Sequence, residues 1–401
     1  MKKSKILGAI LLISGVTIGA GMLGLPIKTG LGGFLPALIA FTICWCVMLW
    51  TAYLFLELNL SLNGNNINLI SMAKKTFGRP GQILMWFIYL LQLNALIVAY
   101  LCHGGELFLR PLENIIGFKI HNFYGQIFLL SIFCPFIYFG LNSVDYLNRF
   151  LMIGLGITFI LMILLVSPQV QTINLQHVNY HYTLISTAII IASFGFHIII
   201  PSLTSYLNKD VKIIKFSLFL GTFIPFIIYI IWEFLILGTI PSSGGISIST
   251  ANLYGIDIAG ILYKKLNNNT INITTHLFSI FAVITSLIGV SQSLFDFWID
   301  GLSFSKIGKS KKLLFLLTFG PALIIIIGFK ANFLIALDYA GIFVSILLGI
   351  FPILMIWKAR YYLKLSTPYT VKGGKTSLVL GLILFILIII IVLGNKIGLF
   401  F

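Results

Sequence analysis

Long apolar runs, separated by short polar or charged connections, dominate the pattern of this 401-residue sequence. A helix that crosses a membrane needs about 20 predominantly apolar residues, because it rises about 1.5 Å per residue through a hydrocarbon core about 30 Å thick. Runs of that length, bounded by charged or turn residues, predict an all-α integral membrane protein with about eleven transmembrane helices. The expected spans are residues 6–27, 33–59, 82–109, 123–141, 150–167, 183–206, 213–239, 276–299, 313–329, 332–356 and 377–395.

The composition agrees with this pattern. Hydrophobic residues make up 59% of the chain and charged residues 9%, whereas soluble globular domains carry about 25% charged residues. This excludes a water-soluble enzyme and makes the lipid bilayer the expected surroundings. The 26 Lys and Arg residues outnumber the 10 Asp and Glu residues, for a net charge of +16. In a soluble protein this excess would suggest nucleic acid, but no nucleic-acid partner is expected here, because basic residues accumulate in the cytoplasmic connections of membrane proteins.

Basic residues are distributed unevenly between alternate connections. Placing the N-terminus inside puts nineteen Lys and Arg residues in the cytoplasmic connections and six outside, with Lys28 at the end of the first span. This predicts a cytoplasmic N-terminus and, with eleven spans, an external C-terminus. The first apolar run, Ile6 to Ile27, is too long for the core of a signal peptide and is expected to be retained.

No cofactor or metal site is expected. The four cysteines, Cys44, Cys46, Cys102 and Cys134, fall inside apolar segments and form no zinc or disulfide pattern. No soluble domain or phosphate-binding loop interrupts the spans, which argues against an ATP-driven pump. The longest external connection, about 240–275, is rich in turn residues and is expected to be flexible around one short amphipathic helix.

Two spans depart from a uniform apolar helix. The first carries Gly15, Gly19 and Gly21 near its midpoint, and the sixth carries Ser193-Phe194-Gly195-Phe196-His197 followed by Pro201. Glycine costs about 1 kcal/mol relative to alanine inside a helix. Non-helical backbone at mid-membrane depth occurs only where it is buried in protein or lines a cavity. The alternative explanation is close helix packing through small residues.

The spacing of the two interruptions favours broken helices. They lie in the first and sixth spans, and an odd repeat of five spans inserts its second copy with the opposite orientation. The broken helices would then face one another across the midplane, which is the arrangement of secondary transporters built on inverted repeats. Half-helix ends expose free N–H groups on one side of a break and free carbonyls on the other, which suits a zwitterionic ligand.

The residues around both interruptions resemble the bacterial tyrosine-specific and tryptophan-specific permeases of the hydroxy and aromatic amino acid permease family, within the amino acid-polyamine-organocation superfamily. The resemblance runs from Gly8 to the last span. It is carried by Thr17-Ile18-Gly19-Ala20-Gly21-Met22-Leu23 with Pro26, Ser193-Phe194-Gly195-Phe196-His197 with Pro201-Ser202-Leu203, Gly104-Gly105-Glu106-Leu107, Leu294-Phe295-Asp296, Asp300, Tyr339-Ala340-Gly341 and Val371-Lys372-Gly373-Gly374.

The resemblance implies one transmembrane transporter domain, 1–401, with a five-plus-five inverted repeat and discontinuous helices 1 and 6. Its repeats would span 6–167 and 183–356, and 377–395 would be an additional eleventh helix. It also implies proton symport of an aromatic amino acid, tyrosine first and tryptophan next, into the cell across a bacterial cytoplasmic (inner) membrane by alternating access.

The same resemblance implies roles for the residues of the two breaks. The first break would offer backbone N–H groups to the substrate carboxylate, from the segment Thr17, Gly19, Ala20, Gly21 and Met22. The second would offer carbonyls to the ammonium group, and Phe194 and Phe196 beside Gly195 would form aromatic walls, which stack well against Tyr or Trp.

Ionisable residues inside the membrane are costly, so each is a candidate for coupling or gating. His197, directly after the second break, either carries the proton or fixes the unwound backbone as a neutral ring. Gln92, His103 and Glu106 lie in a narrow arc of the third span and form either an entry path and relay or a helix contact. Glu233, deep in the seventh span, is a second candidate proton site.

One face of the eighth span carries Ser286, Gly289, Ser293, Asp296 and Asp300. In related sodium-coupled transporters the first and eighth spans hold a cation, so this face is a candidate for coupling-ion chemistry. Serine hydroxyls equally suit tight packing. Asp296 and Asp300 are interpreted as an inner gate or loop anchor.

An enzyme, a differently coupled transporter and a sensor are the alternative functions. A membrane-embedded enzyme would need converging catalytic groups, and His103 with Glu106 is the nearest pair, without a helical His-Glu-x-x-His set. A sodium-coupled or uncoupled amino acid transporter, or a membrane sensor that binds substrate without carrying it, would keep the same fold. The sequence does not give the shape of the pocket, which would distinguish tyrosine, tryptophan and phenylalanine as substrates. It also predicts no oligomeric state.

Overall fold

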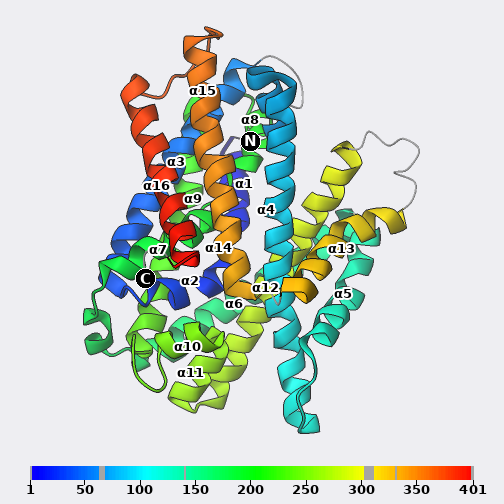
Figure 1. Ribbon diagram of the computed structural model, residues 1–401, viewed down its shortest axis with the longest axis vertical. Helices are drawn as coiled ribbons and strands as arrows, with labels where there is room; N and C mark the ends of the chain where they lie inside the picture. Colours follow the sequence, from blue (N-terminus) through cyan, green and yellow to red (C-terminus); the bar gives the residue numbers. More distant parts are fainter. Residues whose placement is uncertain (1, 63–67, 140, 302–310, 330–331, 399–401) are drawn as a thin grey trace.

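The computed structural model describes residues 2–62, 68–139, 141–301, 311–329 and 332–398, and all regular elements within these ranges are helical (Figure 1). Nine helices there are long and apolar enough to cross a membrane, and two shorter helices bent by 57° make a tenth candidate span. A shorter apolar helix at Asn122–Tyr138 coincides with the fourth expected span. The all-α membrane fold is therefore confirmed, and each of the eleven expected spans falls on one of these helices.

The helices follow one another with short connections. The first half of the chain contains α1 (Lys2–Thr17), α2 (Gly21–Thr29), α3 (Phe34–Ser61), α4 (Leu69–Ile116), α5 (Asn122–Phe139), α6 (Leu141–Val166) and the 3-10 turns η1 (Ser167–Gln169) and η2 (Thr172–Gln176). The second half contains α7 (Tyr180–Ser193), η3 (His197–Ile199), α8 (Ile200–Tyr206), α9 (Val211–Thr239), α10 (Ile248–Tyr254), α11 (Ile258–Leu266), α12 (Asn269–Gly301), α13 (Lys311–Phe329), α14 (Phe333–Val344), the π-helical η4 (Ser345–Ile350), α15 (Phe351–Tyr361) and α16 (Gly374–Lys396).

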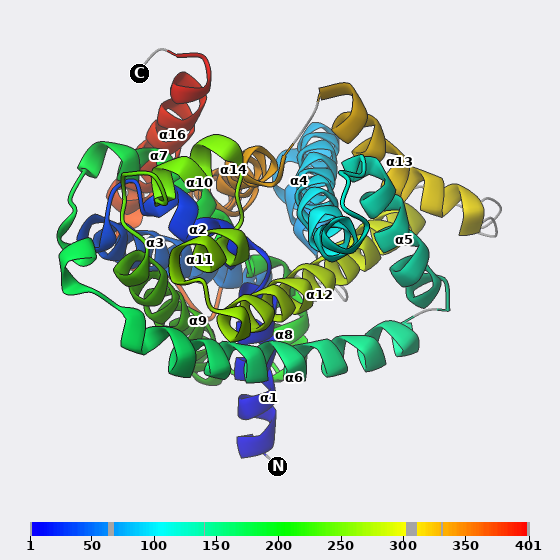
Figure 2. The same cartoon turned by 90° about the horizontal axis from the view of Figure 1, so that it is seen from below.

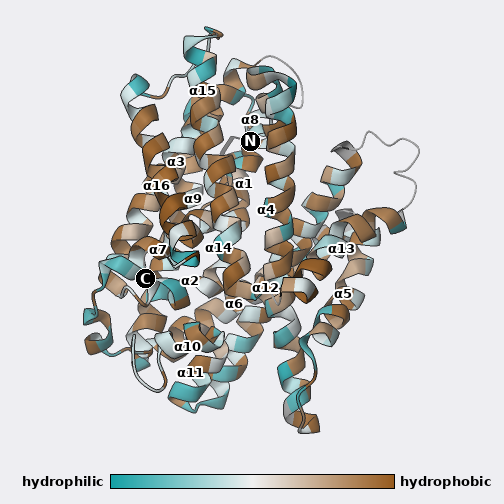
Figure 3. Ribbon diagram, viewed as in Figure 1, coloured by the Kyte–Doolittle hydropathy of each residue, from teal (hydrophilic) through white to brown (hydrophobic). Residues whose placement is uncertain are grey.

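Apolar residues cover the middle of the bundle, and polar residues concentrate toward its two ends (Figure 3). Many large apolar side chains point outward there, such as Ile324 and Leu380, which are 70% and 63% exposed. A soluble protein rarely exposes so much contiguous apolar surface, but lipid tails contact it favourably. Seen from below, α16 stands on one flank of the bundle and α5 and α13 on the other (Figure 2).

Helix α4 is much longer than the expected span 82–109. It begins at Leu69, where the Asn68 side chain accepts a hydrogen bond of 2.9 Å from the Ser71 amide. Gly78, with φ at 74°, interrupts its helical backbone. The expected span begins at 82 because Lys74, Lys75 and Arg79 interrupt the apolar run, but a helix at a membrane surface tolerates such charges.

The connection 240–275 is more ordered than expected, because it contains two short helices where one was predicted. Ser247 caps α10 by accepting from the Thr250 amide at 3.3 Å, and Asp257 caps α11 by accepting from the Gly260 amide at 2.9 Å. Gly255, with φ at 64°, makes the turn between them. Both caps are polar residues three positions before their partners, a helix-start signal that is visible in the sequence.

Two ion-pair groups fix the ends of the helices. At the end of the bundle where α15 ends, buried Glu57 of α3 accepts from Arg360 of α15 at 2.7 Å and from the Val371 amide at 2.7 Å. At the other end, Asp338 of α14 pairs with Lys28 of α2 at 3.1 Å and with Lys396 of α16 at 3.3 Å. These contacts join helices that are distant in sequence.

Replacing Arg360 with alanine tests the first group. The Arg360→Ala change leaves the Glu57 carboxylate buried without a cation, which is expected to cost about 3–5 kcal/mol of folding free energy. The measurement is the thermal unfolding midpoint of the purified protein in detergent. The double change Glu57→Gln with Arg360→Met should recover much of the loss, and Lys372→Ala, on an exposed side chain, should have little effect. An unaltered midpoint for Arg360→Ala would contradict a stabilising role for the pair.

Candidate functional site

The first membrane span is broken at its predicted position. Helix α1 ends at Thr17, and α2 begins at Gly21 at an angle of 57°. The Ala20 amide donates a hydrogen bond of 2.8 Å to the Ser286 hydroxyl of α12. Among the described residues, the amides of Gly19 and Gly21 have no hydrogen-bond partner. The break therefore presents free backbone donors beside a hydroxyl group.

The sixth span is broken as well. Helix α7 ends at Ser193, and after Phe194–Phe196 the chain continues through η3 into α8. Phe194 and Phe196 are wholly buried. A Cβ on Gly195 would lie 3.0 Å from the Ala192 carbonyl oxygen, so the chain has little room for a side chain there. A short turn of this kind explains why glycine stands between two large aromatic residues.

The two broken spans run antiparallel and side by side. At one end the Asn179 amide, just before α7, donates to the Gly32 carbonyl at 2.7 Å, just after α2. At the other end the Lys5 ammonium group lies 5.4 Å from the ring centre of Tyr206. Between these ends, a Cβ on Gly21 would lie 3.4 Å from the Ser193 hydroxyl. The breaks thus face one another, as the five-span spacing predicts.

Helix α9 connects the two breaks, and sequence reasoning missed two of the residues involved. The Tyr229 hydroxyl lies 2.6 Å from the Thr17 carbonyl oxygen and 3.1 Å from the Ser193 carbonyl oxygen. One turn further along, the Trp232 indole donates to the Met22 carbonyl at 3.0 Å. With Glu233, these polar-tipped residues recur at i, i+3 and i+4 in an aliphatic helix, which is the signal that would have indicated an inward face.

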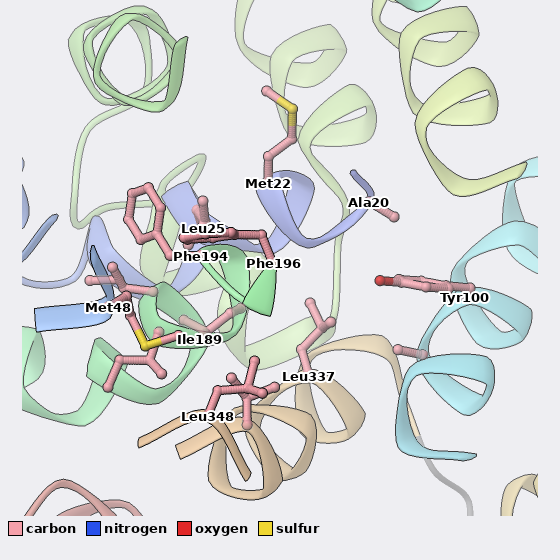
Figure 4. Close-up of a cluster of buried hydrophobic side chains, with 14 of the residues drawn as sticks. Ala20, Met22, Leu25, Met48, Tyr100, Ile189, Phe194, Phe196, Leu337 and Leu348 are labelled. Carbon is pink, nitrogen blue, oxygen red and sulfur yellow. The ribbon is translucent and has the colours of Figure 1, made fainter. Parts of the chain in front are cut away.

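Apolar and aromatic side chains surround the breaks. Figure 4 shows Tyr100 of α4 extending toward the space beside Ala20, with Phe194 and Phe196 close together near the breaks and Met22 pointing away from them. The Tyr100 hydroxyl also pairs with the Ser286 hydroxyl. Phe194 lies edge-on to Tyr229, at 5.4 Å between ring centres, so it supports the break rather than an open wall.

His197 is buried directly after the second break. Its Nε2 lies 2.9 Å from the Thr51 hydroxyl of α3, and the ring of Phe55 lies edge-on to it at 6.3 Å. Its Nδ1 has no hydrogen-bond partner within the described chain. His197 therefore ties the second break to α3.

The predicted stripe on α4 is only partly brought to the site. His103 stacks on Phe333 of α14 at 4.5 Å, and Glu106 pairs with Arg110 at 3.6 Å. Gln92 lies three to four turns away along α4, buried, with Oε1 unpaired among the described residues. His103 and Glu106 thus lie at the end of the bundle that carries α10 and α11, and Gln92 lies away from them.

A small cavity of about 30 Å³ lies beside His103 and Glu106, enough for about one water molecule. Its lining comes from α2, α4, the α10–α11 turn and the start of α14. Arg110 crosses this end to pair with Asp257. Burial alone would raise the pKa of Asp257, but the adjacent Arg110 charge outweighs that effect and lowers the pKa. This cavity is therefore too small for an amino acid.

The face of α12 divides along its length. Ser286 contacts the first break, as described above, whereas the Ser293 hydroxyl donates to its own helix at Gly289, 2.8 Å away, and is exposed. Asp296 accepts a hydrogen bond of 2.9 Å from Gln292. The Asp300 side chain lies outside the described part of the structure. Of the predicted residues on this helix, Ser286 is the one at the break.

A bundle of membrane-length helices, in which two antiparallel broken helices meet at the centre, defines a membrane transporter. Similarity to known proteins leads to the same class. The model of the tryptophan/tyrosine permease family matches residues 2–393, and the chain belongs to this family. Its family and relatives are permeases and transport proteins, so the chain is a transporter and not an enzyme.

Known relatives extend over the full chain. Tyrosine-specific transport system 1 of Haemophilus influenzae is 32% identical, over 96% of this chain and 96% of the relative. The tryptophan-specific transport protein of the same organism is 27% identical, over 100% and 98%. A mutant manganese transporter of Eremococcus coleocola has a similar solved structure, with a TM-score of 0.63 and 14% identity, covering 97% of this chain and 85% of that one. At that identity the likeness concerns the fold alone.

Replacing Gly21 with valine tests the first break. The branched side chain would cover the free amides and press on Ser193, so uptake of substrate is expected to fall at least about tenfold while the protein still inserts and folds. Gly156→Val is the matched control, because Gly156 is exposed on α6 with nothing within 4 Å of an added Cβ. Wild-type uptake by Gly21→Val would remove the break from the substrate site.

Removing the Tyr229 hydroxyl tests the link between the breaks. In Tyr229→Phe the Thr17 and Ser193 carbonyls lose their common donor, which is expected to cost about 1–3 kcal/mol of stability. We expect a lower unfolding midpoint in detergent and reduced uptake. The exposed Tyr146 provides the comparison, since Tyr146→Phe should change neither quantity. Equal behaviour of both variants would show that the bridge contributes nothing.

Proposed function

We propose that this chain is a secondary active importer of aromatic amino acids, with tyrosine the preferred substrate and tryptophan the next, driven by proton symport. The observation that carries the proposal is the first break, where the Gly19 and Gly21 amides lack partners beside the Ser286 hydroxyl. Free amides at a half-helix N-terminus attract a carboxylate, both by hydrogen bonding and through the helix dipole. An amino acid bound there would place its carboxylate at α2.

The ammonium group of the substrate would be received by carbonyl oxygens. The Thr17 and Ser193 carbonyls both approach the single hydroxyl of Tyr229. A carbonyl oxygen accepts two hydrogen bonds, so each retains acceptor capacity. The two charged ends of an amino acid therefore find complementary backbone groups on opposite sides of the breaks.

The substrate side chain is proposed to be aromatic. Tyr100 and Phe196 place aromatic rings beside the breaks, and such rings favour stacked or edge-on contacts with another ring. The names of the family and of its tyrosine-specific and tryptophan-specific relatives support the same substrate class.

Alternating access is proposed between two five-helix repeats, 6–167 and 183–356, with 377–395 as an additional helix. The Arg110–Asp257 pair, which joins α4 to the start of α11, supports a state that is shut at the end carrying α10 and α11. The exposed Ser293 and Gly289 on α12 support an opening toward the opposite end. The excess of basic residues supports placing that opposite end, with the N-terminus, in the cytoplasm and the C-terminus outside a bacterial cytoplasmic membrane.

The test is uptake of labelled tyrosine and tryptophan into proteoliposomes under an inward proton gradient, an inward sodium gradient or no gradient. Accumulation of tyrosine with protons alone is expected, with inhibition by tryptophan and little inhibition by serine. Accumulation only with sodium would contradict proton coupling and would make Ser286 the residue to test next. Binding without counterflow exchange would indicate a sensor instead of a carrier.

A further inference from the structure

Glu233 of α9 is a buried carboxyl group without a cationic partner. Three acidic side chains in the described ranges are buried: Glu57, Asp257 and Glu233. Glu57 pairs with Arg360, and Asp257 pairs with Arg110. Glu233, at 1% exposure, has the Thr29 hydroxyl 2.8 Å from its Oε2, while its Oε1 has no partner in the described structure.

An ionised carboxylate is costly to bury when a single neutral hydroxyl is its only donor. The charged groups near this position are engaged elsewhere. Lys28, next to Thr29, pairs with Asp338, which also binds Lys396. His177, which follows η2 beside α9, has its Nε2 3.0 Å from the Leu31 carbonyl oxygen. The surroundings therefore favour the neutral, protonated form of Glu233 in this conformation.

The hydrogen-bond geometry couples the protonation of Glu233 to the orientation of the Thr29 hydroxyl. The Thr29 hydroxyl lies 2.9 Å from the Leu25 carbonyl oxygen and 2.8 Å from Glu233 Oε2. A hydroxyl has one proton to donate. When Thr29 donates to Leu25, Glu233 must itself donate, and the chain from carboxylic acid to hydroxyl to carbonyl is satisfied only if Glu233 is protonated. Loss of the proton forces Thr29 to turn toward Glu233 and leave Leu25.

The position of Glu233 connects this proton to the substrate site. Thr29 is the last residue of α2, the half-helix whose first residue is Gly21. On the same face of α9, Trp232 binds the Met22 carbonyl and Tyr229 binds the Thr17 carbonyl. A change in the bond between Glu233 and Thr29 therefore acts on the half-helix that presents free amides to the substrate.

His197 is less suited to carry a proton. Its Nε2 is used by Thr51, and aromatic rings of Phe55 and Phe196 lie against it. Among the interactions of the described residues, no carboxylate faces this ring, so protonation would create a buried cation without an anion. His197 is better explained as the neutral anchor of the second break.

We propose that Glu233 is the residue that carries the coupled proton, with Thr29 as the positioning residue that relates its protonation to α2. The inference rests on the proposed symport function. Glu233 takes up its proton from outside while the end carrying α10 and α11 is open, and it stays protonated while that end is closed. It releases the proton into the cytoplasm once water from the opposite end reaches the carboxylate.

The experiment compares wild type with Glu233→Gln, which keeps the shape of the neutral acid but cannot release a proton. Wild type should accumulate tyrosine up to about tenfold under an inward gradient of one pH unit, for one proton per substrate. Glu233→Gln should lose accumulation entirely while retaining counterflow exchange within about threefold of wild type. Its tyrosine Kd, measured in detergent, should no longer vary with pH.

Two further variants serve as controls. Glu113→Gln replaces a carboxyl group at the far end of α4, where its oxygen accepts from the Ile120 amide at 2.8 Å, and should remain proton-driven. Thr29→Val removes the hydroxyl but not the acid, so it should remain proton-coupled with a shifted pH profile.

Each outcome decides the inference. If wild type ignores the proton gradient, the proposed coupling and the role of Glu233 are both overturned. If wild type and Glu233→Gln respond equally to the gradient, the role of Glu233 alone is overturned. Should Glu233→Gln fail to fold or exchange, Glu233→Asp decides: recovered accumulation with a shifted pH profile supports proton carriage, whereas an inactive folded protein or an unchanged profile overturns it.

Discussion

Backbone N–H and C=O groups inside a membrane must find partners within the protein, since lipid tails offer none. Two helices of this bundle stop near its centre, and the carbonyls and amides released there would be costly if left alone. The Tyr229 hydroxyl lies against the Thr17 and Ser193 carbonyls, one from each break, and Ser286 accepts from the Ala20 amide. The breaks are thus stable because α9 and α12 supply polar groups at the same depth, and what remains unpaired there is available to a ligand.

The groups around the breaks have different tasks. His197 ties the second break to α3 through Thr51, and Trp232 ties the start of α2 to α9. The pairs Arg110–Asp257 and Lys28–Asp338 connect helices toward the end that carries α10 and α11. Neutral polar anchors at the centre and ion pairs toward the ends follow from solvation, because charges are cheaper to accommodate where water is near.

A large part of this architecture was predictable from local patterns. Apolar run lengths located each membrane-spanning helix, and the glycines around Gly19 and Gly195 located both breaks. Boundaries were less accurate where charge and helix coexist. Lys74 and Lys75 lie inside α4, whereas hydropathy places the start of this span at 82. A single helix was expected where α10 and α11 lie, although Ser247 and Asp257 both mark helix starts. Charged residues end an apolar run but do not end a helix.

The sequence by itself determined that the chain lies in a membrane, where its apolar helices lie and where they are interrupted, because these depend on length and on neighbouring residues. The tertiary structure decided which side chains meet the breaks. Tyr229 and Trp232 are more than 200 positions from the carbonyls they bind in the first span, and Gln92 and Ser293, predicted alongside site residues, point elsewhere. Partners of this kind depend on the crossing and rotation of whole helices, which a repeat of 3.6 residues per turn does not fix.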